Sequence, residues 1–281
     1  MQRVIYSVYV DVPAKEHFGA SKNRHDTVEK ASVTVNAFKK HYDRLVESKL
    51  TYAEYCEAEF IMYEYDDQYK TFEKNLLKDF PEITGYEVIN FYKIHLLYEL
   101  AKKYDEILYL DFDAVPVTDE IFFDVWDLSK GICVYPNNDA VSKDRKVNHS
   151  IRSPSAKYFN CHAMLIEKGL NPNNDVINTG IIGARKEDIF KLDFFGGFKD
   201  TMDLMTKLRF EDGMYPDNIR DMFRYDNETI FSYKREVNNV NIQWLDDQWH
   251  YFFDKQGFIP DETKIVHCVC KDFDVIWRKY A

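Results

Sequence analysis

The sequence predicts an α/β fold with a central, mostly parallel sheet flanked by helices, and two observations lead to that prediction. Short apolar runs rich in β-forming residues alternate along the chain with longer stretches in which apolar residues recur at helical spacing. One helical stretch leads directly into a buried strand, which is the crossover unit of a parallel sheet. The expected strands are 4–10, 60–63, 107–110, 132–135, 164–166 and 265–269.

The crossover helix is expected just before the strand 107–110. Asn90 can cap its amino terminus, and the basic pair Lys102 and Lys103 suits the negative end of its dipole. Between these ends, one apolar stripe is formed by Ile94, Leu97, Tyr98 and Ala101.

Length and composition fit a single domain. With 281 residues, 45% of them hydrophobic, the chain can bury one large core without a disulfide or metal staple. We expect two lobes, 1–136 and 137–281. The stretch 137–174 is interrupted by proline and asparagine and is expected to be a largely irregular insertion that covers a substrate.

Charge and patterning exclude several classes of partner. The net charge of -11 repels phosphate backbones, so we expect no nucleic-acid partner. No run approaches the roughly 18 apolar residues that cross a bilayer, and the first residues do not resemble a secretion signal. The prediction is a cytoplasmic protein, in a host cytoplasm if the source is viral. Its five cysteines are expected to be reduced thiols: Cys56, Cys133, Cys161, Cys268 and Cys270.

Two acids follow the strand 107–110. Asp111 and Asp113 are predicted to point the same way, with Phe112 turned toward the core, and Pro116 ends the pairing. Two carboxylates on one face can bind a hard cation such as Mn²⁺ or Mg²⁺, which leaves positions open for phosphate oxygens. The plain alternative is a pair of solvated acids, because residues 272–274 repeat the same letters with no strand before them.

Several segments together resemble glycosyltransferase family 8, the glycogenin and bacterial galactosyltransferase group of the GT-A fold. The segment 93–116 resembles the family's core, and Asn178-Thr179-Gly180 resembles its Asn-Ser/Ala-Gly motif. Residues 225–231 resemble the helix that carries an Asp-Gln pair, and 267–271 resemble the terminal His-x-x-Gly-x-Lys-Pro element. The resemblance covers roughly 93–271 and implies a GT-A fold, with a nucleotide-sugar lobe followed by an acceptor lobe.

The resemblance also implies a site. Asp111, Asp113 and His267 become the protein ligands of Mn²⁺, with Mg²⁺ as the alternative ion. Lys271 neutralises a donor phosphate and Lys93 reaches the donor. The donor-binding set that the resemblance implies is Tyr9, Asp11, Lys93, Asp111, Phe112, Asp113, Asn178, Gly180, His267 and Lys271.

The sugar side of the site is less defined by the motifs. Asp226 and Glu228 are expected to line the sugar without assigned roles, because two registers fit the Asp-Gln pair. Asp175 or Asp226 is expected to stabilise positive charge on the sugar. The terminal element departs from the family, since its glycine and proline are absent: Cys270 precedes Lys271 and Asp272 follows it.

The predicted function is therefore metal-dependent transfer of a hexose, glucose or galactose, from a UDP-sugar to a glycan or protein acceptor. Family resemblance implies retention and raises self-glucosylation as a hypothesis. A sugar nucleotidyltransferase is the first alternative, although no lysine-containing glycine-rich loop follows the first strand. The second is a non-catalytic module that binds nucleotide sugars or glycans. The sequence leaves the oligomeric state open, a homodimer included.

Overall fold

A computed structural model describes residues 1–11, 28–141, 153–210, 225–254 and 257–280. Its centre is a six-stranded sheet in the order β2-β1-β3-β6-β5-β7. β1 is parallel to β2 and β3, β5 is parallel to β7, and β6 is antiparallel to both of its neighbours. The predicted mostly parallel sheet is confirmed. The strands are β1 (Arg3–Val8), β2 (Glu59–Tyr63), β3 (Glu106–Leu110), β5 (Ile132–Pro136), β6 (Ile177–Arg185) and β7 (Ile242–Trp244).

A second, three-stranded sheet joins the end of the chain to its middle. Its order is β4-β9-β8, with β4 spanning Ala114–Pro116, β8 Tyr251–Phe252 and β9 Ile265–His267. β4 and β9 are antiparallel, and their register sets Ala114 opposite His267. This pairing brings a residue near the carboxy terminus beside the acids that precede β4.

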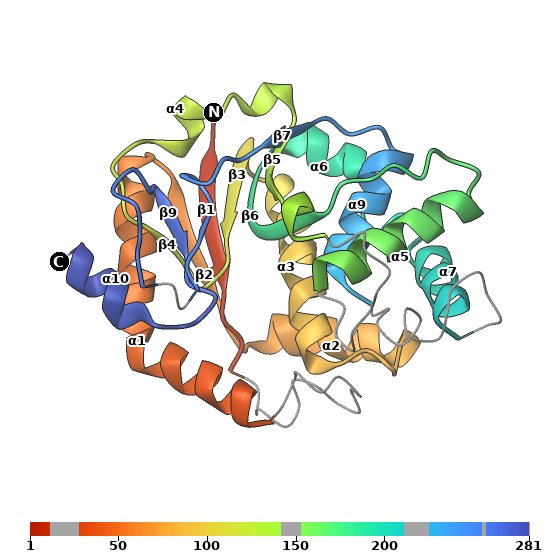
Figure 1. Ribbon diagram of the computed structural model, residues 1–281, viewed down its shortest axis with the longest axis horizontal. Coiled ribbons are helices and arrows are strands. Elements are labelled where there is room, and N and C mark those ends of the chain that lie inside the picture. The colour runs from red at the N-terminus through yellow and green to blue at the C-terminus, as the bar shows by residue number, and fades with distance from the viewer. Residues whose placement is uncertain (12–27, 142–152, 211–224, 255–256, 281) are drawn as a thin grey trace.

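Helices cover both faces of the large sheet. In Figure 1, α1 and α10 lie on one side of it, and α3, α5, α7 and α9 lie on the other. Among the described residues, no helix is both long enough and apolar enough to cross a membrane. The helices are α1 (Val28–Tyr55), α2 (Asp67–Asp79), α3 (Gly85–Ala101), α4 (Phe122–Val125), α5 (Ser153–Glu167), α6 (Lys186–Leu192), α7 (Phe198–Phe210), α9 (Asn227–Val237) and α10 (Phe273–Lys279).

The crossover helix α3 begins earlier than predicted. Thr84, not Asn90, is its N-cap: the Thr84 hydroxyl accepts from the Glu87 backbone N–H, and the Glu87 carboxylate accepts from the Thr84 N–H. Such a reciprocal box satisfies two amide donors that the first turn leaves without helical partners, whereas a single Asn90 side chain satisfies one. The helix is also buried on most sides, so its apolar residues extend well beyond the predicted stripe.

The region after β5 is more regular than predicted. The expected strand 164–166 is wrong, because Met164 and Leu165 lie inside α5, where they are buried together with Cys161. Their spacing suits one face of a helix that packs against α7 and α9. Residues 142–152 of the expected insertion lie outside the described residues.

The last strand ends at His267 and not at residue 269. All five cysteines are free, as expected.

Replacing Thr84 with alanine tests the capping box. We expect Thr84→Ala to lower the free energy of unfolding by about 1 kcal/mol, because the Glu87 amide loses its acceptor at the partly buried start of α3. Urea unfolding followed by circular dichroism measures the loss. Thr84→Ser, which keeps the hydroxyl, is the control and should lose little; an equal loss in both variants would assign the effect to the lost methyl group.

Candidate active site

The acid turn, which we define as residues 111–113, connects the two sheets. β3 ends at Leu110, and the Asp111 backbone N–H donates to the Gly180 carbonyl of β6 at 2.7 Å. The Ala114 N–H then donates to the Asp111 carbonyl at 2.8 Å and starts β4. The two acids converge as predicted, although a turn and not a strand face directs them. Phe112 between them is buried, as expected.

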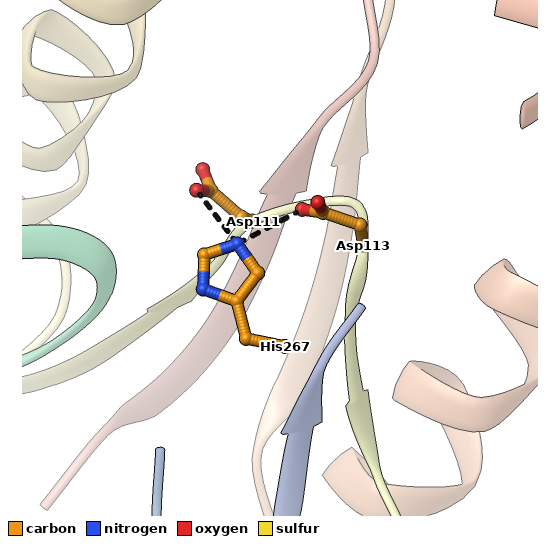
Figure 2. Close-up of side chains that lie close together, drawn as sticks. All are labelled: Asp111, Asp113 and His267. Atoms are coloured by element: carbon orange, nitrogen blue, oxygen red, sulfur yellow. Dashed lines mark ion pairs between the residues drawn. The ribbon is translucent and has the colours of Figure 1, made fainter. Parts of the chain in front are cut away.

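Asp111, Asp113 and His267 form the candidate metal group (Figure 2). His267 Nε2 lies 3.4 Å from Asp113 Oδ1 and 3.8 Å from Asp111 Oδ2. One ligand atom from each residue lies within 4.8 Å of the others. Two carboxylates and an imidazole suit a divalent ion such as Mn²⁺, so the residues present fit the predicted ion.

A lysine holds the second oxygen of each carboxylate. Lys93 Nζ donates to Asp111 Oδ1 at 3.1 Å and to the Thr179 carbonyl at 3.1 Å, and its side chain is buried. Lys271 Nζ donates to Asp113 Oδ2. Each carboxylate is therefore fixed by a cation on one oxygen and turns the other oxygen toward His267. Tyr109 adds a hydroxyl hydrogen bond to Asp111 Oδ1.

The charges around Asp113 keep it ionised. Burial by itself raises the pKa of this carboxyl, but Lys271 and His267 more than offset burial and hold the pKa well below its usual range. The same carboxylate raises the pKa of Lys271 against the opposing effect of burial. Asp113 is thus an anionic oxygen donor at neutral pH.

A third lysine, which was not predicted from the sequence, lies beside the acid turn. Lys49 of α1 is 0% exposed, and its Nζ donates to the Phe112 carbonyl at 2.9 Å. Among the described residues it has no carboxylate within ion-pair distance, and burial lowers its pKa to about 7 although Asp113 and Asp111 oppose the shift. A lysine in the middle of a long helix resembles a solvated charge in a sequence, so only the packing identifies it.

Gly180 is needed because His267 lies against its backbone. A Cβ placed on Gly180 would lie 2.5 Å from His267 Cε1 and 2.9 Å from Nδ1, which is closer than real Cβ contacts. The Asn178 side chain contacts the same part of β6, since its Oδ1 accepts from the Gly180 N–H at 2.9 Å. The Asn-Thr-Gly motif therefore shapes one wall beside the imidazole.

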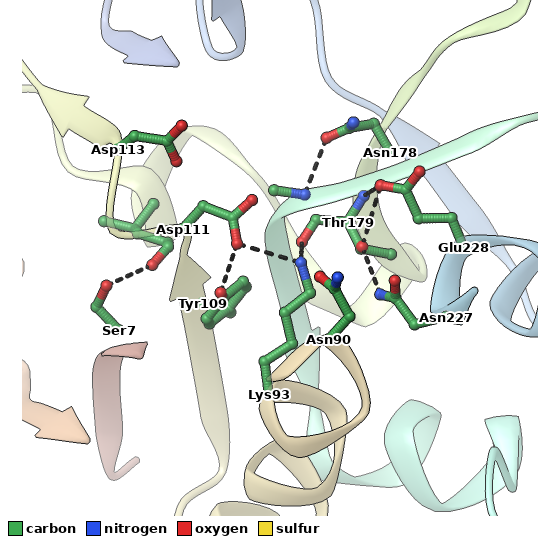
Figure 3. A network of polar contacts seen from close by, with 12 residues as sticks. Ser7, Asn90, Lys93, Tyr109, Asp111, Asp113, Asn178, Thr179, Asn227 and Glu228 are labelled. Carbon is green, nitrogen blue, oxygen red and sulfur yellow. Dashed lines mark hydrogen bonds and ion pairs between the residues drawn. The ribbon is translucent and has the colours of Figure 1, made fainter. Parts of the chain in front are cut away.

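Thr179, between these two residues, connects the metal group to α9 (Figure 3). Glu228 Oε1 accepts from the Thr179 N–H at 2.9 Å, and Asn227 Nδ2 donates to the Thr179 hydroxyl at 2.7 Å. The other Glu228 oxygen accepts from Lys157 of α5. Burial alone raises the pKa of Glu228, but Lys157 and Lys93 outweigh it, and the pKa is lowered. Glu228 is thus a buried anion that is connected to Asp111 through Thr179 and Lys93.

The sequence model of the family described as glycosyl transferase family 8 matches residues 4–183, which is more than half of the chain. The chain belongs to glycosyl transferase family 8. It is therefore a glycosyltransferase, and the predicted GT-A type of α/β fold is confirmed. The nucleotidyltransferase alternative is set aside.

Comparison with solved structures returns glycosyltransferases of low sequence identity. An active-site mutant of LgtC is 11% identical with a TM-score of 0.47, over 95% of this chain and 87% of that one. A glycosyltransferase involved in glycosylation of the major capsid of PBCV-1 is 13% identical with a TM-score of 0.47, over 99% and 100%. Mouse xyloside xylosyltransferase 1 is 10% identical with a TM-score of 0.45, over 96% and 98%. The search of curated proteins found no match.

The remaining predicted residues have partners outside the candidate metal group. Asp226 caps α9, with its two oxygens accepting from the Thr229 N–H and hydroxyl. Asp175 accepts from Asn138 Nδ2 at 2.9 Å, and Asp11 pairs with Lys39 at 2.9 Å. Tyr9 stacks on Phe112 with ring centroids 4.8 Å apart.

The buried Tyr9 hydroxyl has no hydrogen-bond partner among the described residues. Burial raises its pKa to about 12, so it is a neutral O–H at the carboxyl end of β1. Residues 272–274, the second copy of the acid pattern, start α10, and there Asp274 pairs with Lys40 at the surface. Asp274 Oδ1 also lies 3.7 Å from His41 Nε2, but among the described residues only the first copy brings both of its acids to one histidine.

Gly180→Ala should weaken metal binding more than it weakens the fold. The added methyl group displaces His267, and we expect the affinity for Mn²⁺, measured by electron paramagnetic resonance of the free ion, to fall about tenfold or more. Gly183→Ala on the same strand is the control, because its methyl group would meet the Phe122 ring instead. Unchanged Mn²⁺ affinity in Gly180→Ala would contradict the close approach.

Lys157→Met should destabilise the protein in a pH-dependent way. It leaves the buried Glu228 carboxylate without its cation, and we expect a loss of about 3 kcal/mol in unfolding free energy at pH 7. The paired Glu228 has a lowered pKa, so its stabilisation is present above the unfolded pKa of about 4.3 and is lost as the pH falls.

In the variant, burial raises the Glu228 pKa, and acid relieves the penalty. The difference between the two proteins should therefore shrink from pH 7 toward pH 4 in urea unfolding. Adding Glu228→Gln to Lys157→Met should recover part of the loss at pH 7, because the unpaired charge is removed. A loss that is constant with pH would rule out the ion pair as its cause.

Proposed function

We propose that this family 8 glycosyltransferase moves a hexose, glucose or galactose, from a UDP-sugar to a glycan or protein acceptor in a metal-dependent reaction with retention. One observation carries the proposal: Asp111, Asp113 and His267 converge while a lysine fixes the outer oxygen of each carboxylate. This group lies where β1 and β3 end, and ligands of parallel sheets bind beyond the carboxyl ends of the strands.

The three converging residues hold the ion, Mn²⁺ or alternatively Mg²⁺. When bound, it neutralises the charge that develops on the departing diphosphate. Lys93 keeps Asp111 oriented through an ion pair. Lys271 pairs with Asp113, and we assign its ammonium to a phosphate of the donor. A chain with net charge -11 needs this local positive charge to bind a diphosphate at all.

The base of the nucleotide is assigned to the end of β1. Tyr9 and Phe112 form a stacked aromatic pair there, and the unpartnered Tyr9 hydroxyl is a donor that a bound nucleotide can satisfy. Asp11, two residues further on, is the second candidate for contact with the nucleoside.

Glu228 is assigned to the sugar. Its carboxylate is ionised, rigidly held by Thr179 and Lys157, and connected to Asp111 through Thr179 and Lys93. A fixed anion stabilises the positive charge that forms on a sugar ring as the bond to the diphosphate breaks. Asp226 serves as a cap for the same helix, and Asp175 stays the other candidate for stabilising that positive charge.

Release of free nucleotide tests the function. We expect UDP release from UDP-glucose or UDP-galactose with Mn²⁺, little release from GDP- or dTDP-sugars, and none after EDTA. Asp113→Asn should lower the rate by about a thousandfold, because several kcal/mol of charge stabilisation is lost. Asp274→Asn, in the second acid pattern, is the matched control and should behave like the unmodified chain.

Intact-protein mass measured during the same reaction tests the acceptor. A ladder of hexose masses would identify this chain as its own acceptor, and its absence, with release on adding simple sugars, would point to a glycan. Release that survives EDTA would overturn the metal dependence. Mn²⁺-dependent donor binding without release to any acceptor would instead indicate a binding module.

A further inference from the structure

A second imidazole lies behind the candidate metal group. His250 is 0% exposed and directly precedes β8, and β8 pairs with β9 so that Phe252 lies opposite His267. The Phe253 N–H donates to the His267 carbonyl at 2.9 Å. The backbone of this small sheet therefore fixes the position of His250 relative to His267.

The two imidazoles share one hydrogen bond. His250 Nε2 lies 2.8 Å from His267 Nδ1, while the opposite nitrogen of His267, Nε2, faces the carboxylates. The His250 ring packs against Tyr135, at a centroid distance of 4.9 Å, and against Phe252, at 4.7 Å, and these two rings lie 5.3 Å from each other. Packed in this way, His250 cannot turn its ring without moving its aromatic neighbours.

The direction of this hydrogen bond determines which nitrogen of His267 keeps its lone pair. A neutral imidazole has one N–H and one nitrogen lone pair, so one of the two facing nitrogens donates and the other accepts. If His267 Nδ1 donates, its Nε2 keeps the lone pair that can bind a metal ion. If His250 donates instead, His267 carries its proton on Nε2 and cannot be a ligand.

We propose that His250 is a positioning residue that accepts the Nδ1–H of His267 and so presents the Nε2 lone pair of His267 to the metal ion. The inference rests on the metal site of the proposed function. A partner on the outer nitrogen of a ligating histidine fixes both its tautomer and its ring orientation. In this site the usual carboxylate or carbonyl partner is replaced by a second imidazole.

The same hydrogen bond also sets the tautomer of His250. As the acceptor at Nε2, it carries its own proton on Nδ1, and that nitrogen has no hydrogen-bond partner among the described residues. A buried polar atom without a partner is unfavourable by about 1–3 kcal/mol, so a purely structural residue at this position would favour an apolar side chain. An apolar side chain has no acceptor for the Nδ1–H of His267, whereas His250 provides one at Nε2.

The affinity for Mn²⁺ tests the proposal without any catalytic turnover. We expect His250→Phe, which fills similar space without an acceptor, to weaken Mn²⁺ binding by about 10- to 100-fold in electron paramagnetic resonance titrations. His250→Gln, whose amide oxygen can accept the same N–H, should stay within a few-fold of the unmodified chain. His95→Phe is the matched control, because His95 stacks on Phe72 between α2 and α3.

Two results would overturn the inference while leaving the proposed function in place. One is His250→Phe binding Mn²⁺ as tightly as the unmodified chain, and the other is His250→Gln losing as much affinity as His250→Phe. An unmodified chain that does not bind Mn²⁺ would overturn the metal site together with this inference.

If His250→Phe does not fold, nitrogen NMR of the unmodified Zn²⁺-loaded protein provides the test, because Zn²⁺ is diamagnetic and accepts imidazole and carboxylate ligands. We expect His250 to be protonated at Nδ1 and bare at Nε2, with its signals assigned by their absence in His250→Gln. Protonation at Nε2 in that form would overturn the inference.

Discussion

Two carboxylates held side by side in a largely buried turn are the constraint on which the site depends. Like charges at such short range oppose each other's ionisation, and burial opposes it further. At about 4 Å and an effective dielectric constant near 20, one opposite charge returns about 4 kcal/mol, while desolvation costs several kcal/mol per ion. The attraction of a single lysine therefore offsets roughly the desolvation cost of one carboxylate. The chain meets this demand with a lysine on Asp111 and another on Asp113, while the buried Lys49 donates a hydrogen bond to the backbone carbonyl between them.

These three lysines come from distant parts of the chain, and this explains how the fold serves the site. Lys49 belongs to α1, Lys93 to α3, and Lys271 to the turn after β9. Lysine side chains from two helices on opposite sides of the large sheet (Figure 1) thus reach the acid turn. The small sheet is the third component, because the pairing of β4 with β9 sets His267 beside Ala114. The site is a product of tertiary packing, with no local segment that contains it.

The sequence predicted those parts of the fold that local patterns determine. Five of its six strands were found, together with the acid pair and the histidine that meets it, because apolar runs and ordered motifs mark them. The strand expected at 164–166 was wrong because a short apolar run reads equally well as a buried helical turn. Lys49, Lys157 and His250 were not predicted. Each acts through a contact with a residue distant in sequence, and a lone lysine or histidine has no local signature.

The terminal element shows how packing can replace a motif residue. Where the family pattern has glycine before the lysine, this chain has Cys270, and the left-handed backbone falls on Lys271 itself, with φ of 61°. A non-glycine residue in that region is strained by about 1–2 kcal/mol. The Lys271 N–H donates to the Cys268 carbonyl at 3.0 Å, and its ammonium reaches Asp113. A charge-assisted hydrogen bond in a buried setting contributes about 1.5–3 kcal/mol, enough to offset the strain. The ion pair and the unusual turn therefore depend on each other, and the lysine keeps its place at the carboxylate without the glycine.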